Sequence, residues 1–128
     1  MTEIITLSND KRVANFSSPH PFTFEDGSIL KAVDNSESER LKIIFIEEEL
    51  EGGDIKLSFK LSDDVKREMI KYYDLWFNNE LEVAFCPLPM IVAIKEEMGE
   101  NYLINSPFRS IRVEDRINKV ISINKQCI

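Results

Sequence analysis

The sequence has little of what most enzymes use for catalysis. It contains one histidine, His20, and two cysteines, Cys86 and Cys127. Catalysis by a histidine base would depend on His20 alone, which stands between two prolines without a serine or cysteine motif beside it. Two cysteines are too few for a disulfide framework, and their spacing is not that of a metal site. We therefore expect reduced thiols, no bound metal and a structural or surface role for His20.

Long apolar runs and nucleotide-binding motifs are also missing. No apolar stretch approaches the ~20 residues that a membrane-crossing helix needs, and the start of the chain lacks the pattern of a signal peptide. Glycine-rich phosphate loops and the Gly-x-Ser-x-Gly elbow do not occur. Carboxylates are plentiful, so a paired-carboxylate hydrolase stays open, although none stands in an apolar run that would raise its pKa by burial. These absences favour binding over catalysis and predict a cytosolic protein.

The composition is that of a globular protein with more acidic than basic residues. Its 128 residues, 43% of them hydrophobic, suit one domain with a single core. No repeat or linker divides the chain, so we expect one domain over residues 1–128. The formal net charge of −7 argues against binding to a nucleic acid polymer, which requires a basic face. A small anion held in one local basic pocket remains compatible with that charge.

One basic stretch interrupts this acidic chain. Residues 101–128 hold five Lys/Arg against two Asp/Glu, which leaves 11 against 21 in residues 1–100. The cations that lie closest together in this stretch are Arg109, Arg112, Arg116 and Lys119. Arginine presents a planar fork of donors that matches a phosphate or a carboxylate bidentately. Two interpretations stay open: the arginines bind an anionic ligand, or they pair with the protein's own carboxylates.

Two hairpins are predicted in the first half of the chain. Residues 22–24 and 29–33 flank an Asp-Gly pair, which is a strong hairpin signal. Residues 41–47 are strongly β-forming and residues 55–61 alternate between apolar and polar, with a Gly-Gly turn between them. The acidic run at this turn is predicted to be solvated and not to bind a metal. Residues 34–40 are predicted to be a polar loop.

Helices dominate the prediction for the second half. Ser62 is a good N-cap, and apolar residues then recur at three- and four-residue steps as far as residues 78–79. Residues 90–98 fit a short buried helix, with a core strand as the alternative. Residues 101–104 are predicted to be extended and residues 117–123 to form a last strand. The whole pattern predicts an α+β fold, an antiparallel sheet with one long amphipathic helix and a second short helix.

Residues 85–116 carry a family resemblance. Phe85 ends a predicted strand before a Cys-Pro-Leu-Pro turn, and the pattern Pro-Phe-Arg-x-x-Arg-Val-x-Asp-Arg follows at residues 107–116. This arrangement resembles the phage anti-Thoeris sponges, the first described family of Thoeris anti-defence proteins. Members of that family bind cyclised ADP-ribose signals made by bacterial TIR proteins and sequester them without cleaving them. The likeness is loose over the whole length and closer over residues 85–116.

The resemblance implies a ligand site. Its residues here are Phe85, Lys95, Arg109, Arg112, Asp115 and Arg116. Phe85 would stack on the adenine, and Arg112 and Arg116 would bind the pyrophosphate with Arg109 alongside. Asp115 would orient an arginine or accept a hydroxyl, and Lys95 stands where the family carries an amide. Read from the residues alone, Phe85 is more often a core side chain and Lys95 a solvated one, and Asp115 with Arg116 is open to interpretation as a surface charge cluster.

The resemblance also implies a biological setting. It predicts a phage protein in the host cytoplasm that acts as a homo-oligomer, with no catalytic residue, cofactor or metal. We expect at least a dimer, because so short a chain has little surface with which to enclose a dinucleotide-sized ligand. The isoleucines of residues 117–123 are the predicted interface, with the arginines beside it. Two other functions stay open, a nucleotide-acting phage hydrolase and a structural or adaptor phage protein whose arginines serve an interface.

Overall fold

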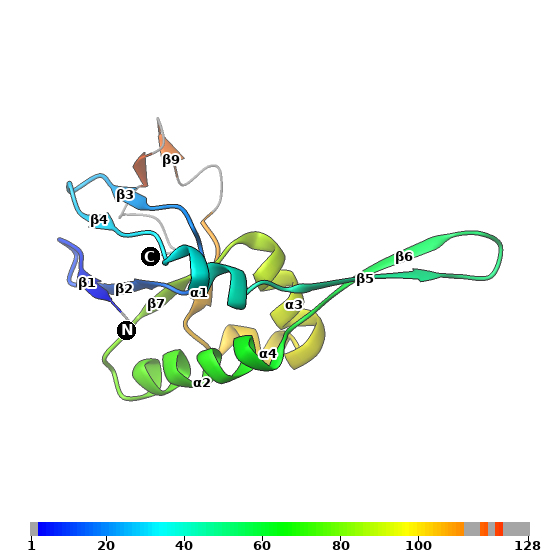
Figure 1. Cartoon of the computed structure of the whole chain (residues 1–128). Helices are drawn as coiled ribbons and strands as arrows, with labels where there is room; N and C mark the ends of the chain where they lie inside the picture. The colour runs from blue at the N-terminus through cyan, green and yellow to red at the C-terminus, as the bar shows by residue number, and fades with distance from the viewer. Residues whose placement is uncertain (1–2, 112–115, 118–119, 122–128) are drawn as a thin grey trace.

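The computed structural model describes residues 3–111, 116–117 and 120–121, and within that part the fold is α+β with three sheets. The first sheet has the strand order β1-β2-β7-β8 (Figure 1). Its strands are β1 (Ile4–Thr6), β2 (Arg12–Asn15), β7 (Val83–Phe85) and β8 (Phe108–Arg109). β1 and β2 pair antiparallel, whereas β2 with β7 and β7 with β8 pair parallel. This sheet is the middle layer of the molecule.

The second sheet has the order β4-β3-β10-β9 and covers one face of the first. Its strands are β3 (Phe22–Phe24), β4 (Ile29–Leu30), β9 (Arg116–Ile117) and β10 (Val120–Ile121). β3 and β4 form the predicted Asp-Gly hairpin, in which Gly27 takes the positive φ of 89° that glycine tolerates best. β10 pairs parallel with β3 and antiparallel with β9. The strand predicted over residues 117–123 is therefore wrong: the described part of it belongs to two short strands that face each other.

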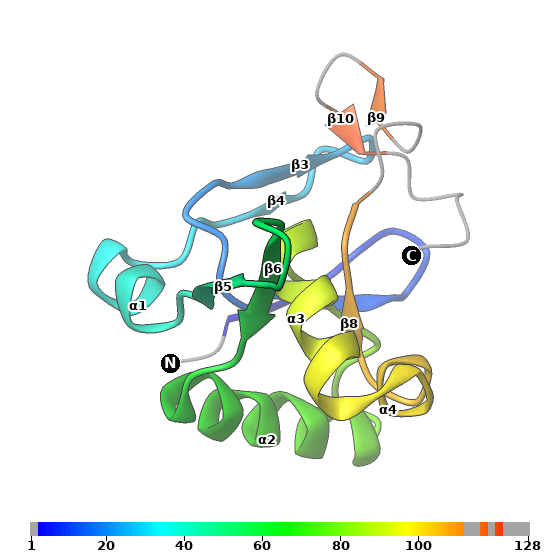
Figure 2. The same cartoon turned by 90° about the vertical axis from the view of Figure 1, so that its right-hand side faces the viewer.

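The third sheet is the predicted second hairpin, β5 (Ile44–Glu49) with β6 (Ile55–Lys60). Figure 1 shows this pair of strands reaching away from the rest of the molecule, and Figure 2 looks along it. The base of β6 packs against α3 (Leu88–Met98). We call residues 44–60 the β-arm.

The helices lie mainly in the second half of the chain, as predicted. Ser62 caps α2 (Asp63–Phe77) by accepting a hydrogen bond from the Val65 N–H at 3.2 Å. Residues 90–98 belong to the helix α3 and not to the alternative core strand. Two predictions are wrong. The loop over residues 34–40 contains α1 (Asn35–Arg40), where the Asp34 carboxylate accepts from the Ser36 N–H at 2.8 Å, and residues 101–104 lie in α4 (Glu100–Ile104) after a break at Gly99.

The core has two parts, one on each face of the first sheet (Figures 1 and 2). Alternate residues of β7 point to opposite faces, as strand geometry requires. Ala84 contributes to the cluster beneath α2 and α3, whereas Val83 and Phe85 contribute to the cluster beneath β3 and β10. The fold class α+β is thus confirmed, but the prediction of an antiparallel sheet is wrong. Local patterns reveal hairpins, whereas parallel neighbours are joined by long crossovers, here α3 and α4 between β7 and β8.

No helix in the described part of the chain combines the length and the apolar character needed to cross a membrane.

Candidate functional site

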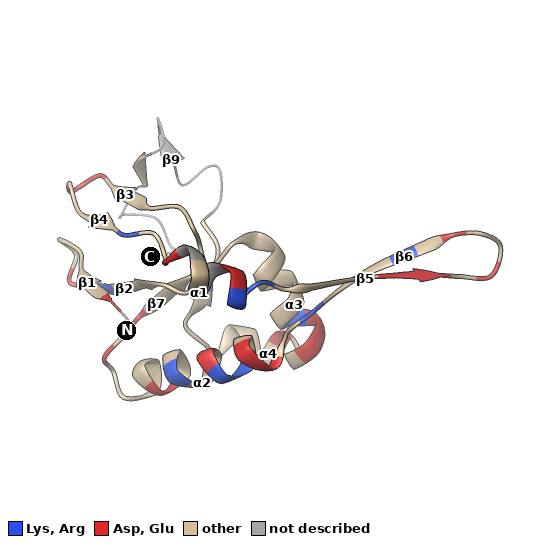
Figure 3. Ribbon diagram, viewed as in Figure 1, with Lys and Arg blue, Asp and Glu red and all other residues tan. Residues whose placement is uncertain are grey.

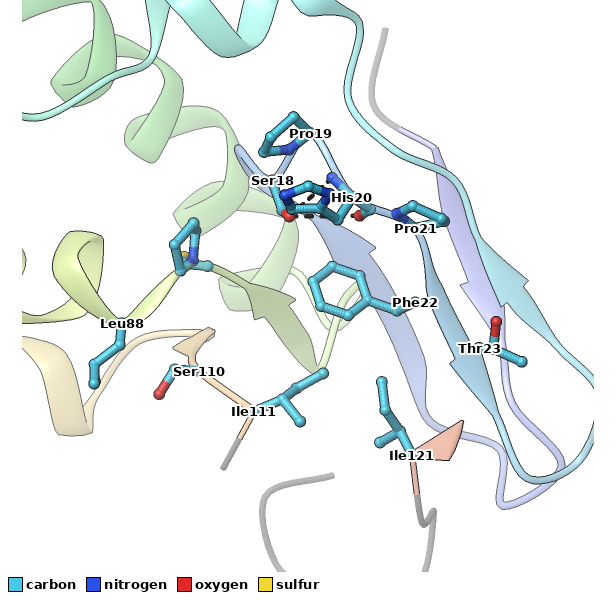
Figure 4. A pocket seen from close by; sticks show the side chains of 12 residues that line it. Ser18, Pro19, His20, Pro21, Phe22, Thr23, Leu88, Ser110, Ile111 and Ile121 are labelled. Carbon is cyan, nitrogen blue, oxygen red and sulfur yellow. Dashed lines mark hydrogen bonds between the residues drawn. The ribbon is translucent and has the colours of Figure 1, made fainter. Parts of the chain in front are cut away.

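A cavity of about 660 Å³ lies where the second sheet meets the start of α3 (Figure 4). Its walls come from residues 18–23 before and within β3, from residues 86–88 between β7 and α3, and from residues 110–111 after β8, together with Ile121 of β10. Small-molecule sites in proteins usually occupy roughly 300–1,000 Å³. This cavity therefore has the size of a nucleotide-binding site.

One wall is held in place by a buried amide. The Asn15 side chain donates to the carbonyl oxygens of Ser18 at 3.0 Å and Lys31 at 3.1 Å, and its Oδ1 accepts from the Ser18 N–H at 2.9 Å. The Ser18 hydroxyl then accepts from the His20 N–H at 3.2 Å. Proline on either side of His20 further restricts the backbone. The wall that carries Ser18 and His20 is thus preorganised from β2, before any ligand arrives.

One aromatic residue, Phe22, lines the cavity with the small part of its surface, 8%, that is exposed. Figure 4 shows Phe22 in the middle of the lining residues. Behind it stands Phe85, whose ring centroid lies 5.6 Å from that of Phe22 and 5.9 Å from that of Phe24. Phe85 has no exposed surface. Of the two interpretations that the sequence allowed for Phe85, a core residue or a ligand-binding residue, its burial agrees with the core residue. Stacking of Phe85 on a ligand would require Phe22 to move.

Arg109 lies beside the cavity but is engaged elsewhere. Its Nη1 donates to the carbonyl oxygen of Leu103 at 2.9 Å, and its Nη2 donates to that of Ile104 at 3.1 Å. These carbonyls are at the C-terminal end of α4, where the helix dipole favours a cation. Burial lowers the pKa of the Arg109 guanidinium. In this structure Arg109 therefore anchors α4 to β8.

The other predicted arginines lie, in the sequence, between two residues of the cavity lining. Arg112 follows Ile111 in the chain, and the backbone of Arg116 in β9 pairs with Ile121; both isoleucines line the cavity. Arg112 and Asp115 themselves lie outside the described residues, and for Arg116 the description covers the backbone. No Arg or Lys is found among the described residues that line the cavity.

Lys95 is not among the residues that line the cavity. It is exposed on α3, seven residues after Leu88 at the start of the helix. At ~1.5 Å per residue this places it roughly 10 Å further along the helix axis. Its neighbours Glu96 and Glu97 accept from the backbone N–H groups of Phe59 in β6 and of Leu61 just after it, at 3.4 and 3.1 Å. This part of α3 supports the base of the β-arm.

The electrostatic setting of the cavity suits an anion. The N-terminus of α3 begins at the cavity wall, and its first turn contains no acidic residue. A helix N-terminus carries a partial positive charge and favours phosphate. No Asp or Glu is found among the described residues that line the cavity. The described lining holds no Lys or Arg either, so the partial charge of the helix end is the feature that favours an anion. This charge acts without many free donors, because Pro89 has no N–H and the Met90 and Ile91 N–H groups donate to the Pro87 carbonyl oxygen.

Groups for covalent chemistry are scarce at the same place. The Cys86 thiol lines the cavity, but burial raises its pKa, so it is present as the neutral thiol and not as the nucleophilic thiolate. His20 is exposed at the rim, with its backbone carbonyl accepting from Asn15 at 3.4 Å. In the described part of the chain no cluster of His, Cys, Asp and Glu is arranged to hold a metal ion.

Sequence reasoning missed three parts of this site: Phe22, the polar wall at Ser18, and the N-terminus of α3. A usable signal was present for the last of these, because Pro87 and Pro89 mark a helix start that needs no side-chain cap. Comparison with protein families, with curated proteins and with solved structures finds no match to this chain.

Proposed function

We propose that this protein binds a cyclic ADP-ribose-type nucleotide in the cavity beside Phe22 and sequesters it without cleaving it, as a phage anti-Thoeris sponge does. The observation that supports this most is that Ile111 and Ile121 both line the cavity, and that the backbone of Arg116 pairs with Ile121. The arginines predicted to bind the ligand lie between these two isoleucines in the sequence. The resemblance of residues 85–116 to the sponge family suggests which anion these arginines bind.

The lining offers a partner for each part of such a ligand. The face of Phe22 accepts the adenine, and aromatic stacking on a base contributes about 1–3 kcal/mol where it has been measured. The pyrophosphate lies toward the N-terminus of α3, whose partial positive charge favours phosphate. Arg112 and Arg116 are predicted to bind it through charge-assisted hydrogen bonds. Thr23 and Ser110 also line the cavity, and their hydroxyls are the candidates for binding the ribose oxygens, because the Ser18 hydroxyl is hydrogen-bonded to the His20 backbone.

Sequestration is favoured over hydrolysis by the chemistry of the lining. A nucleotide hydrolase requires a base, a nucleophile or a metal beside the scissile bond. Of the titratable side chains among the lining residues described above, the Cys86 thiol is neutral and His20 has no carboxylate partner within the lining. A lining without charged side chains among its described residues, made largely of proline, phenylalanine, leucine and isoleucine, serves retention of the ligand.

A charge placed at the cavity mouth tests this proposal. Leu88 lines the cavity, is 63% exposed and occupies the first residue of α3. Leu88→Glu adds a negative charge where the phosphates are expected, while an acidic residue in the first turn stabilises a helix. Lost binding will therefore not be the result of unfolding. We expect at least tenfold weaker binding of cyclic ADP-ribose in a calorimetric titration.

The matched control is Ile70→Glu. Ile70 is 61% exposed, lies in the middle of α2 and is not among the lining residues, so this variant changes the net charge equally at another place. It should bind as the unmodified protein does, apart from a small long-range effect that added salt removes. Equal affinity of Leu88→Glu and Ile70→Glu would show that the ligand does not enter this cavity.

A further inference from the structure

The charge of the described cavity lining depends on one side chain, that of His20. Imidazole is the group that ordinarily gains a positive charge as pH falls from about 8 to about 5.5. His20 is the only histidine of the chain, and it lines the cavity at the rim (Figure 4). Cys86, the other titratable residue of the described lining, stays neutral over this range because burial raises the pKa of its thiol.

The two chain segments that make most of the cavity wall contain no charged residue. Residues 13–24, which include His20, hold no Asp, Glu, Lys or Arg, and neither do residues 83–94, which include the start of α3. Figure 3 shows both stretches in tan. A positive charge on His20 is therefore not neutralised by a carboxylate of either segment. It adds to the partial positive charge at the N-terminus of α3.

Charged side chains on the segments around this wall are bound elsewhere. Lys31 and Lys42 form ion pairs with glutamates, at 3.9 and 2.8 Å. The Asp34 carboxylate accepts from the first turn of α1 at 2.8 Å, and Arg109 donates to the end of α4 at 2.9 Å. Arginines, including those predicted to bind the ligand, stay charged at every relevant pH, and carboxylates ordinarily titrate near about pH 4. Neither kind of group changes its charge where imidazole does.

The backbone at His20 is held independently of its side chain. The His20 N–H donates to the Ser18 hydroxyl at 3.2 Å, and the His20 carbonyl oxygen accepts from the Asn15 amide at 3.4 Å. In the described part of the chain the hydrogen bonds of His20 all involve its backbone. The imidazole is thus presented on a fixed wall and is available to a ligand. A substitution at this residue changes the group that the ligand meets and keeps the wall.

We propose that His20 binds the anionic part of the ligand as an imidazolium, so that the protein retains its ligand more tightly as pH falls. This inference rests on the proposed function, because it takes the ligand in the cavity to carry a pyrophosphate. The imidazolium donates from both ring nitrogens, whereas neutral imidazole donates from one. A hydrogen bond from a charged donor to a phosphate oxygen is also shorter and stronger than one from a neutral donor. His20 thereby makes retention of the ligand sensitive to pH.

Calorimetric titration with cyclic ADP-ribose at about pH 8 and about pH 5.5 tests this role. The unmodified protein should bind about tenfold more tightly at the lower pH, a change that one charge-assisted hydrogen bond is sufficient to produce. His20→Gln never gains a charge, so it should lose this pH dependence and bind weakly at both values. His20→Lys is charged at both values and should bind tightly at both. Protonation of the ligand itself is common to all three proteins and cancels in the comparison.

Lys56→Gln is the matched control for charge. Lys56 is exposed on the β-arm and is not among the lining residues, so this variant removes one positive charge at another place. It should keep the pH dependence of the unmodified protein. Equal pH dependence of His20→Gln and Lys56→Gln would overturn the inference and leave the proposed function standing. Failure of the unmodified protein to bind the nucleotide at either pH would overturn the proposed function and this inference with it.

A proton NMR titration measures the same coupling on the protein. Because the chain has one histidine, the imidazole ring gives a single C2–H signal. Coupling between two binding events is reciprocal, so a ligand that prefers the charged form tenfold moves the midpoint of this signal up by about one pH unit. The same midpoint with and without saturating cyclic ADP-ribose would contradict contact between His20 and the anion.

Discussion

Asn15→Ala should destabilise the protein and loosen one wall of the cavity at the same time. The Asn15 amide makes three hydrogen bonds of 2.9–3.1 Å, two as donor to the carbonyls of Ser18 and Lys31 and one as acceptor from the Ser18 N–H. A longer one, of 3.4 Å, reaches the His20 carbonyl. Alanine leaves the partner groups of the three short hydrogen bonds without the amide. At about 1 kcal/mol for each net hydrogen bond, the free energy of unfolding should fall by roughly 3 kcal/mol.

Urea denaturation followed by tryptophan fluorescence measures this change. Ser36→Ala is the control, since the Ser36 hydroxyl donates a short 2.6 Å hydrogen bond to Asp34 on the surface. Water replaces that partner, so its loss should cost less than about 0.5 kcal/mol. A loss for Asn15→Ala as small as that of the control would refute the idea that the buried amide organises this wall.

Three further outcomes follow from the described contacts. Ser62→Ala removes the cap of α2, and thermal denaturation should show a loss of about 1 kcal/mol; an unchanged midpoint would mean that water replaces the cap. The hydrogen bonds from Arg12, at 2.6 Å between Nη2 and Oε1, lower the pKa of Glu82. The pairing therefore adds to the free energy of unfolding above the unfolded pKa of about 4, and this contribution is lost as pH falls through the lower folded pKa. The free energy of unfolding of Glu82→Gln should depend less on pH over that range than that of the unmodified protein; an equal dependence for the two proteins would contradict the pairing. In a Cys127→Ser variant, buried Cys86 should react with a thiol reagent in denaturant but not in the native state; rapid native labelling would show that the cavity opens to Cys86.

Local chemistry made much of the fold predictable. The Asp-Gly pair before Ser28 and the Ser62 cap each act within a few residues, and both the β3–β4 hairpin and α2 are where those signals place them. The parallel pairing of β2 with β7 joins residues about 70 positions apart. No short pattern encodes such a contact, because the chain between them decides whether the strands meet.

The difference between local and long-range contacts also decided which site residues could be predicted. Phe22 and Phe85 are both strand phenylalanines of the same core cluster, and either could face a ligand. The second sheet decides between them, since β3 lies over β7 and leaves the ring of Phe22 at the cavity. The arginines could be recognised from sequence because their spacing and charge stand out in an acidic chain. The roles proposed for Arg112, Arg116 and Asp115 stay predictions.

Recovery of the ligand tests sequestration most directly. The purified protein is incubated with cyclic ADP-ribose isomers, separated from free nucleotide and heated, and the released nucleotide is identified by mass spectrometry. We predict that a cyclic ADP-ribose is retained in proportion to the protein and released with its mass and cyclic linkage unchanged. Release of linear ADP-ribose or another cleavage product would show an enzyme, and the absence of any retained nucleotide would contradict the proposed function.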